Sequence, residues 1–131
     1  MVHGVNVKPG KPTILAICNK KPVIGLHGNP VSALVIAELF LKPIIEKTLG
    51  LSTRRNKNYI LATMATNWAS QAGREDWVPV QLVPNGDGYL AEPVFGKSNL
   101  IFSLVRADGL IKIPADATGI HAGDIVQVYP R

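Results

Sequence analysis

The chain has 131 residues, of which 47% are hydrophobic and 18% are charged, and its formal net charge is +5. This length allows one ordinary domain, or one small domain with an attached piece, because domains usually need about 100–150 residues each. Two complete enzymatic domains are therefore excluded. The composition predicts a globular protein with enough apolar material for a core. Its apolar runs are far shorter than the roughly 20 residues of a membrane span, and no signal-peptide pattern opens the sequence, so membrane insertion is not expected.

The charge of the chain is uneven. Residues 1–57 hold nine basic and two acidic side chains, which gives +7, so the remainder carries –2. The positive part indicates an anionic ligand or a nucleic acid, or else an ordinary solvated basic surface. The single cysteine, Cys18, excludes an internal disulfide, and the three histidines are not spaced as metal ligands. A reducing cytoplasm is the expected compartment, and no metal site is predicted within the chain.

Short apolar runs bounded by proline and glycine predict strands near the beginning of the chain. These runs are Val5–Val7, Thr13–Cys18 and Pro22–Leu26. The segment between the first two, Lys8–Pro12, reads Lys-Pro-Gly-Lys-Pro. Its prolines lack the amide that a strand ladder needs and its glycine tolerates positive φ, so we expect a shaped loop there.

A single long helix is predicted to follow, from Pro30 to about Leu49. Asn29 can cap its first turn, a proline is harmless at the first helical position, and Gly50 ends it. The apolar residues cover more than one stripe, so much of the circumference is expected to need burial. Pro43 cannot donate to the carbonyl four residues earlier and should kink the last turns.

From Leu51 onward the pattern changes to short runs separated by turn signals, which predicts an all-β unit shaped as a small barrel or a sandwich. Its strands are expected at 59–66, 77–83, 89–94, 110–113 and 125–129. The stretch 98–109 is compatible with one turn of helix or with an irregular strand that runs into a tight turn. The predicted fold class is therefore α/β followed by all-β.

Two segments of the positive part could hold an oxyanion. Lys8 and Lys11 lie three residues apart on the stiff loop, where two ammonium groups can converge on one anion. Two solvated lysines in a turn are the alternative. The segment 25–32 runs from a strand into the helix, where free backbone N–H groups and the Ser32 hydroxyl favour an anion. A plain capped connection is the alternative here, since no Walker or dinucleotide-binding pattern is present.

The β unit contains two further polar candidates. Arg74, in the run Gly-Arg-Glu-Asp-Trp, offers a planar fork to an oxyanion, although Glu75 and Asp76 could neutralise it in a structural ion pair. Ser98 follows a glycine and a lysine. No Ser-His-Asp order, nucleophile elbow or activated cysteine is present, so the residues do not identify a catalytic group.

Four motifs, taken in their order, resemble the C-terminal part of the molybdopterin molybdenumtransferases, the molybdenum-insertion enzymes related to the E domain of gephyrin. They are VKPGKP, GLHGNPVSALVIAELFLKP, GREDW and KSNLIFSLVRADGL. The most specific portion is the pairing of KPGKP with the later GNPVS. The family usually has a proline where this chain has His27.

The resemblance implies a fold and a function. Residues 1–50 would be the C-terminal portion of a three-layer α/β molybdopterin-binding domain, and residues 51–131 a C-terminal β-barrel-like domain. The full enzyme is expected to insert molybdate into adenylylated molybdopterin in a magnesium-dependent reaction, as a cytoplasmic homodimer. The oxyanion-binding residues implied by matching positions are Lys8, Lys11, Pro12, Ser32, Arg74 and Ser98. The magnesium and pterin ligands are expected upstream, so this chain alone is expected to be inactive.

Two other classes of function stay open. A non-catalytic scaffolding module of the same fold would bind a peptide or protein, and anions would have no effect on it. A nucleic-acid binder is disfavoured, because the eight aromatic residues are scattered along the chain and offer no stacking platform.

Overall fold

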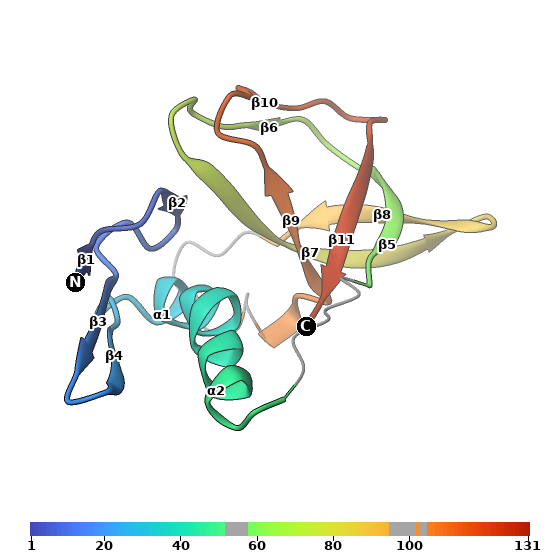
Figure 1. The fold of residues 1–131 in the computed structure, drawn as a ribbon. Coiled ribbons are helices and arrows are strands. Elements are labelled where there is room, and N and C mark those ends of the chain that lie inside the picture. The colour runs from blue at the N-terminus through green and yellow to red at the C-terminus, as the bar shows by residue number, and fades with distance from the viewer. Residues whose placement is uncertain (52–57, 95–101, 103–104) are drawn as a thin grey trace. The chain divides into compact units, whose positions relative to one another are not determined.

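The computed structural model of the chain describes residues 1–51, 58–94, 102 and 105–131. It divides into two compact units, residues 1–56 and residues 57–131. The first unit contains a small sheet and a helical segment, and the second is almost entirely β (Figure 1).

The first unit contains a three-stranded antiparallel sheet. Its strands, in order, are β1 (Val2–His3), β3 (Ile14–Cys18) and β4 (Lys21–Gly25). The two longer strands confirm the predictions at 13–18 and 22–26. The strand predicted at 5–7 is wrong in its bounds, because Gly4 has a φ of +94° and breaks the extended backbone. The strands that flank this break are β1 and β2 (Val7–Lys8).

A two-residue turn, Asn19-Lys20, joins β3 to β4. Both residues have positive φ, +48° and +62°, as in the type I′ turns whose twist matches that of paired strands. The hairpin stays in register along its whole length, from the pair Cys18 and Lys21 to the pair Ile14 and Gly25.

The predicted helix is present but it is not uniform. It begins as α1 (Pro30–Ile36), continues as a π-helical turn, η1 (Ala37–Leu41), and ends as α2 (Lys42–Thr48). At the end of η1 the amide of Lys42 donates to the carbonyl of Ala37, five residues earlier. Pro43 is the second residue of α2, which follows this widened turn. The kink predicted at Pro43 stays a prediction, and the irregularity that the structure shows is this π turn, whose hydrogen bond spans five residues.

Gly50 ends the helix as predicted. Its φ is +72°, and the amides of Gly50 and Leu51 donate to the carbonyls of Lys47 and Glu46 over 3.1 and 3.0 Å. These two bonds form a Schellman motif, which satisfies carbonyls that the helix itself leaves without donors.

The second unit is a closed β-barrel. Its strands are β5 (Ile60–Met64), β7 (Glu75–Asn85), β8 (Gly88–Pro93), β9 (Gly109–Ile113) and β11 (Ile125–Pro130). They follow the order β7-β8-β5-β11-β9, and β9 pairs back with β7 to close the ring (Figure 1). Neighbouring strands are antiparallel, except for the parallel pair of β5 and β8. The five predicted strands are confirmed, and the barrel is the correct one of the two predicted shapes.

The barrel encloses the hydrophobic core. Inward-facing residues alternate along the strands, as Val78 and Val80 do on β7 and Val126 and Val128 do on β11. The core cluster consists of Ala62, Met64, Val78, Val80, Ala91, Ile111, Ile113, Val126 and Val128. This alternation explains why the strand pattern is readable in the sequence.

Two shorter elements are not predicted by the sequence. Strands β6 (Trp68–Ala69) and β10 (Gly119–Ile120) pair antiparallel with each other, and two residues are too few to show a periodic pattern. In the ambiguous stretch 98–109, the described residues Phe102, Val105 and Arg106 are helical. This favours the helical alternative.

The three-layer α/β arrangement implied by the resemblance is not in this chain. The described residues are mostly β, with one helical segment in the first unit. The strands β1, β3 and β4 pair antiparallel, whereas a three-layer α/β fold needs a largely parallel sheet with helices on both faces.

Candidate oxyanion-binding residues

The loop of residues 8–12 has a fixed backbone and exposed lysines. The buried Thr13 closes it, because its hydroxyl and its amide both donate to the carbonyl of Gly10, over 2.7 and 3.1 Å. On the other side, the amide of Val5 donates to the carbonyl of Lys11 over 2.9 Å. Lys8 and Lys11 are both exposed. The loop therefore presents two ammonium groups to solvent from a backbone that is already ordered.

Gly10 packs closely against the helix. Its φ is +121°, and a Cβ built at this position would lie 2.4 Å from two carbon atoms of the fully buried Ile36 side chain. Only a glycine allows this approach. The sequence predicts that Gly10 shapes the loop, and the structure adds this contact with the helix.

Ser32 lies four residues before Ile36 and therefore on the same helix face, where Cβ atoms one turn apart are about 5–6 Å from each other. Ser32 is 8% exposed. Within the described residues its hydroxyl makes no hydrogen bond. The contact between Gly10 and Ile36 thus brings the loop that carries Lys8 and Lys11 to the helix face that carries Ser32. Pro12, the remaining predicted residue of the loop, is exposed.

The backbone donors at the helix start differ from the sequence expectation. The Oδ1 atom of Asn29 accepts from the amides of Val31 and Ser32, over 3.0 and 3.2 Å, and Pro30 has no amide hydrogen. The first-turn N–H groups are therefore used by the cap and do not face an anion. His27 accepts from the amide of Asn29 through Nδ1 over 3.2 Å.

Replacing Asn29 by alanine should lower the free energy of unfolding of the first unit by about 1 kcal/mol, because two amides lose their acceptor. Asn29→Asp keeps a capping oxygen and is the matched control, for which we expect little change. Urea denaturation followed by far-UV circular dichroism measures both. Equal stability of the alanine variant and the original chain would show that the cap contributes nothing.

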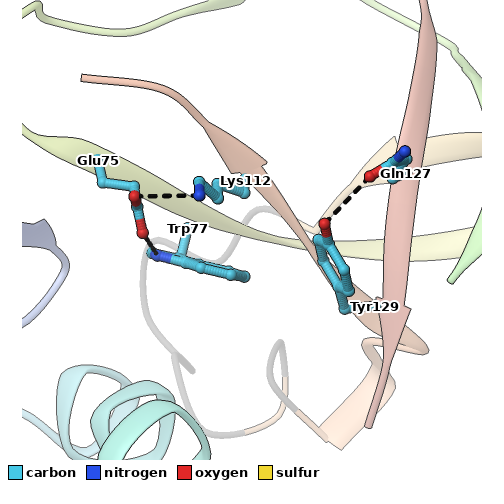
Figure 2. Close-up of polar contacts among 5 residues, drawn as sticks. All are labelled: Glu75, Trp77, Lys112, Gln127 and Tyr129. Atoms are coloured by element: carbon cyan, nitrogen blue, oxygen red, sulfur yellow. Dashed lines mark hydrogen bonds and ion pairs between the residues drawn. The ribbon is translucent and has the colours of Figure 1, made fainter. Parts of the chain in front are cut away.

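Arg74 lies directly before β7 and is half-buried. Glu75 accepts from the indole Nε1 of Trp77 over 2.7 Å and pairs with the Lys112 ammonium over 3.3 Å (Figure 2). Asp76, 3% exposed, accepts from the Ser70 hydroxyl over 3.0 Å. Both carboxylates thus have other partners, and within the described residues the Arg74 side chain forms no ion pair or hydrogen bond. The structural ion pair considered for Arg74 is not observed.

Ser98 lies in the stretch 95–101, outside the described residues, so its predicted role stays a prediction.

In the part of the chain that the structure describes, no group of three or more His, Cys, Asp or Glu side chains could hold a metal ion. No helix in this part of the chain has the length and hydropathy needed to cross a membrane.

A family model that covers most of the second unit gives the class of protein to which the chain belongs. Residues 61–131 match the family model of the MoeA C-terminal region, domain IV. The chain belongs to the MoeA family.

The similarity to proteins of this family covers the first unit as well as the barrel. A molybdopterin biosynthesis protein of Methanocaldococcus jannaschii is 38% identical over 98% of this chain and 29% of its own length. Molybdopterin molybdenumtransferase 1 of Mycobacterium tuberculosis is 33% identical over 82% of this chain and 26% of its own length. The solved MoeA protein of Pyrococcus horikoshii superposes with a TM-score of 0.82 at 32% identity, over 98% of this chain and 31% of that one. The chain thus spans about a third or less of the length of these relatives.

Proposed function

We propose that this chain supplies the oxyanion-binding C-terminal part of a molybdopterin molybdenumtransferase, which inserts molybdate into adenylylated molybdopterin. Residues 1–50 would be the closing portion of the α/β molybdopterin-binding domain, and residues 51–131 the C-terminal barrel domain. The observation that carries the proposal is the contact between Gly10 and Ile36, which joins the lysine loop to the helix face of Ser32.

The residues of the first unit suit an oxyanion by their chemistry. Lys8 and Lys11 provide positive charge and up to six N–H donors, and Ser32, 8% exposed, adds a hydroxyl that has no partner among the described residues. Charge-assisted hydrogen bonds of this type are the strong ones. Because Thr13 already holds the loop backbone, little ordering remains to oppose binding. Pro12 is proposed as a further residue of this oxyanion-binding loop, on the basis of the family resemblance.

The barrel offers a separate donor in Arg74. A guanidinium without a carboxylate partner among the described residues is suited to a molybdate or phosphate oxygen. Ser98 is proposed as a second oxyanion donor of the barrel, on the basis of the family resemblance alone.

Metal insertion and cleavage of the adenylate are proposed to depend on groups outside this chain. The described residues contain no group of three or more His, Cys, Asp or Glu side chains that could hold a metal ion, and the chain alone is expected to bind the oxyanion substrate without turning it over. The proposed full-length protein is a cytoplasmic homodimer, with anionic small molecules as its substrates and no role for nucleic acid.

Replacing Lys11 by alanine is expected to weaken molybdate binding by about tenfold, because one charge-assisted hydrogen bond is lost. Isothermal calorimetry with molybdate, and with sulfate as a second tetrahedral anion, measures the change. Lys47→Ala is the matched control: it removes an exposed lysine from the last turn of α2 and should leave the affinity unchanged.

Two results would contradict this function. One is the absence of molybdate binding at millimolar concentration. The other is equal weakening by Lys11→Ala and Lys47→Ala, which would mean that only the net charge attracts the anion. Peptide binding that anions do not alter would favour the scaffolding alternative.

A further inference from the structure

A tight turn joins β7 to β8 and forms the tip of a hairpin in the second unit. Asn85 and Gly88 are its last paired residues, so Gly86 and Asp87 make the turn, and Gly86 has a φ of +60°. All residues from 84 to 89 are exposed. The tip therefore presents an asparagine with a glycine directly after it to solvent.

Pairing within the hairpin itself holds this tip in the second unit. Strand β5 pairs with β8 only at Leu90 and Ala91, and β9 pairs with β7 no further than Val80. The hairpin accordingly extends beyond the other strands of the barrel (Figure 1). The end of such a ribbon opens locally at a small cost in free energy, while the rest of the domain stays folded. The backbone of Asn85 can thus leave its extended conformation without opening the barrel.

The side chain of Asn85 and the amide of Gly86 are both available for reaction. Within the described residues the Asn85 side chain makes no hydrogen bond, and no backbone hydrogen bond uses the Gly86 amide. A Cβ placed on Gly86 would meet no atom within 4 Å, so the turn is surrounded by open space. Glycine has no side chain of its own to hinder the approach of its nitrogen to the Asn85 carboxamide.

The other described asparagines lack this combination. Asn19 is exposed at the turn between β3 and β4, but a lysine follows it. Asn29 caps the helix and precedes a proline, which has no N–H. The Asn67 side chain accepts from a backbone amide over 2.7 Å, and Asn6 and Asn58 precede a valine and a tyrosine. Among the described residues, the pairing of a free asparagine with a following glycine therefore occurs at the hairpin tip alone.

We propose that Asn85 is a site of spontaneous covalent modification, at which a carboxylate replaces the side-chain amide. The Gly86 nitrogen loses its proton and bonds to Cγ of Asn85, the bond from Cγ to the side-chain nitrogen breaks, and ammonia leaves. Water then opens the resulting five-membered succinimide at one of its two carbonyls. The product at position 85 is an aspartate or an isoaspartate, and the net reaction consumes one water and releases one ammonia.

The modification changes the charge and the pairing of the tip. It adds a negative charge close to Asp87, and an isoaspartate also lengthens the main chain by one carbon at the pair of Asn85 and Gly88. This last pair should be lost, whereas the ring stays closed because β5, β9 and β11 do not pair with the tip. An isoaspartate leaves its α-carboxylate free, which is the group that an isoaspartyl methyltransferase methylates. The reaction is independent of the proposed oxyanion site.

Incubation of the intact chain at mildly alkaline pH, in water enriched in the heavy oxygen isotope, tests the proposal. Each opened ring takes up one heavy oxygen, which peptide mass spectrometry assigns to a residue. Asn19 is the internal control, because it is also exposed at a hairpin turn. We expect Asn85 to convert at least about tenfold faster than Asn19, a difference in activation free energy of about 1.4 kcal/mol. Methyl transfer by an isoaspartyl methyltransferase measures the isoaspartate independently.

Two substitutions identify the glycine as the cause. Gly86→Ala should slow the conversion of Asn85 by about tenfold. Lys20→Gly places a glycine after Asn19, at a position whose φ of +62° suits glycine, and should speed the conversion of Asn19 by at least about fivefold. Because this second effect is a gain, a loss of folding cannot imitate it. Asn85→Gln would require a six-membered ring and should take up no heavy oxygen at this position over the same period.

Three outcomes would overturn the proposal. The first is equal conversion of Asn19 and Asn85 in the original chain, and the second is conversion of Asn85 without uptake of heavy oxygen. The third is a folded chain in which Asn85 converts more than about a hundredfold more slowly than in the chain unfolded by urea, since the paired tip would then protect the asparagine.

Discussion

Replacing Gly109 by alanine is expected to lower the free energy of unfolding of the barrel by about 3 kcal/mol. Gly109 is the first residue of β9, is buried, and pairs with Pro130 of β11. A Cβ at this position would lie 2.5 Å from the carbonyl oxygen of Tyr129 and 2.7 Å from Cγ1 of Val128. The oxygen belongs to the backbone, so relief requires β9 and β11 to move apart, which weakens the pairing of these two barrel strands.

The matched control for this change is Gly88→Ala. Gly88 begins β8, and a Cβ there would meet no atom within 4 Å, so stability should change by less than about 1 kcal/mol. Both tryptophans, Trp68 and Trp77, belong to the second unit. Their fluorescence in urea denaturation therefore follows the barrel itself. A Gly109→Ala variant with the same midpoint as Gly88→Ala would refute the steric argument.

Replacing Gly10 by alanine should destabilise the first unit by about 3 kcal/mol, because a φ of +121° and a collision with Ile36 act together. The Ile36 atoms that collide belong to a side chain, but it is fully buried and has little room to move. The loop would have to leave the helix face. We therefore expect weaker molybdate binding as well as a lower melting temperature, measured by calorimetry and by the circular dichroism of the helix.

Gly28→Ala is the control for this second change. Gly28 precedes the cap residue Asn29, and a Cβ there would meet nothing within 4 Å, so the effect should be small. A Gly10→Ala variant that keeps its melting temperature but loses molybdate binding would mean that the glycine matters only for the anion. A Gly10→Ala variant that loses stability but keeps its affinity for molybdate would show that anion binding does not depend on the position of the loop against the helix.

The sequence predicts the barrel well because its strands have one buried face. Val78 and Val80 alternate with more exposed neighbours on β7, and the same period appears on β11. Strands β1, β6 and β10 have two residues each. Their formation depends on pairing with distant strands, and two residues are too few for a local pattern that predicts a strand. The π turn η1 also cannot be predicted from the periodicity of apolar residues, because it depends on how the backbone accommodates Pro43.

The candidate site is only partly readable in the sequence. Exposed lysines and a glycine in loop 8–12 are visible as a motif, whereas the contact between Gly10 and Ile36 is long-range and appears only in three dimensions. Arg74 forms no ion pair with the two neighbouring carboxylates because both have other partners. Glu75 binds Lys112 and Trp77, and Asp76 binds Ser70. Of the three partner residues Lys112, Trp77 and Ser70, only Trp77 adjoins the carboxylates in the sequence, so the other two pairings could not be predicted from it.

The order of the barrel strands also has a consequence for how the molecule is made. Strand β11 lies between β5 and β9, so it holds together two strands that come earlier in the chain. During synthesis, β5, β7, β8 and β9 can emerge and pair in part, but the ring cannot close until residues 125–130 have left the ribosome. Such late, non-local pairing is slow and leaves strand edges open in the meantime. The nascent barrel is therefore most exposed to mispairing in the interval before strand β11 emerges.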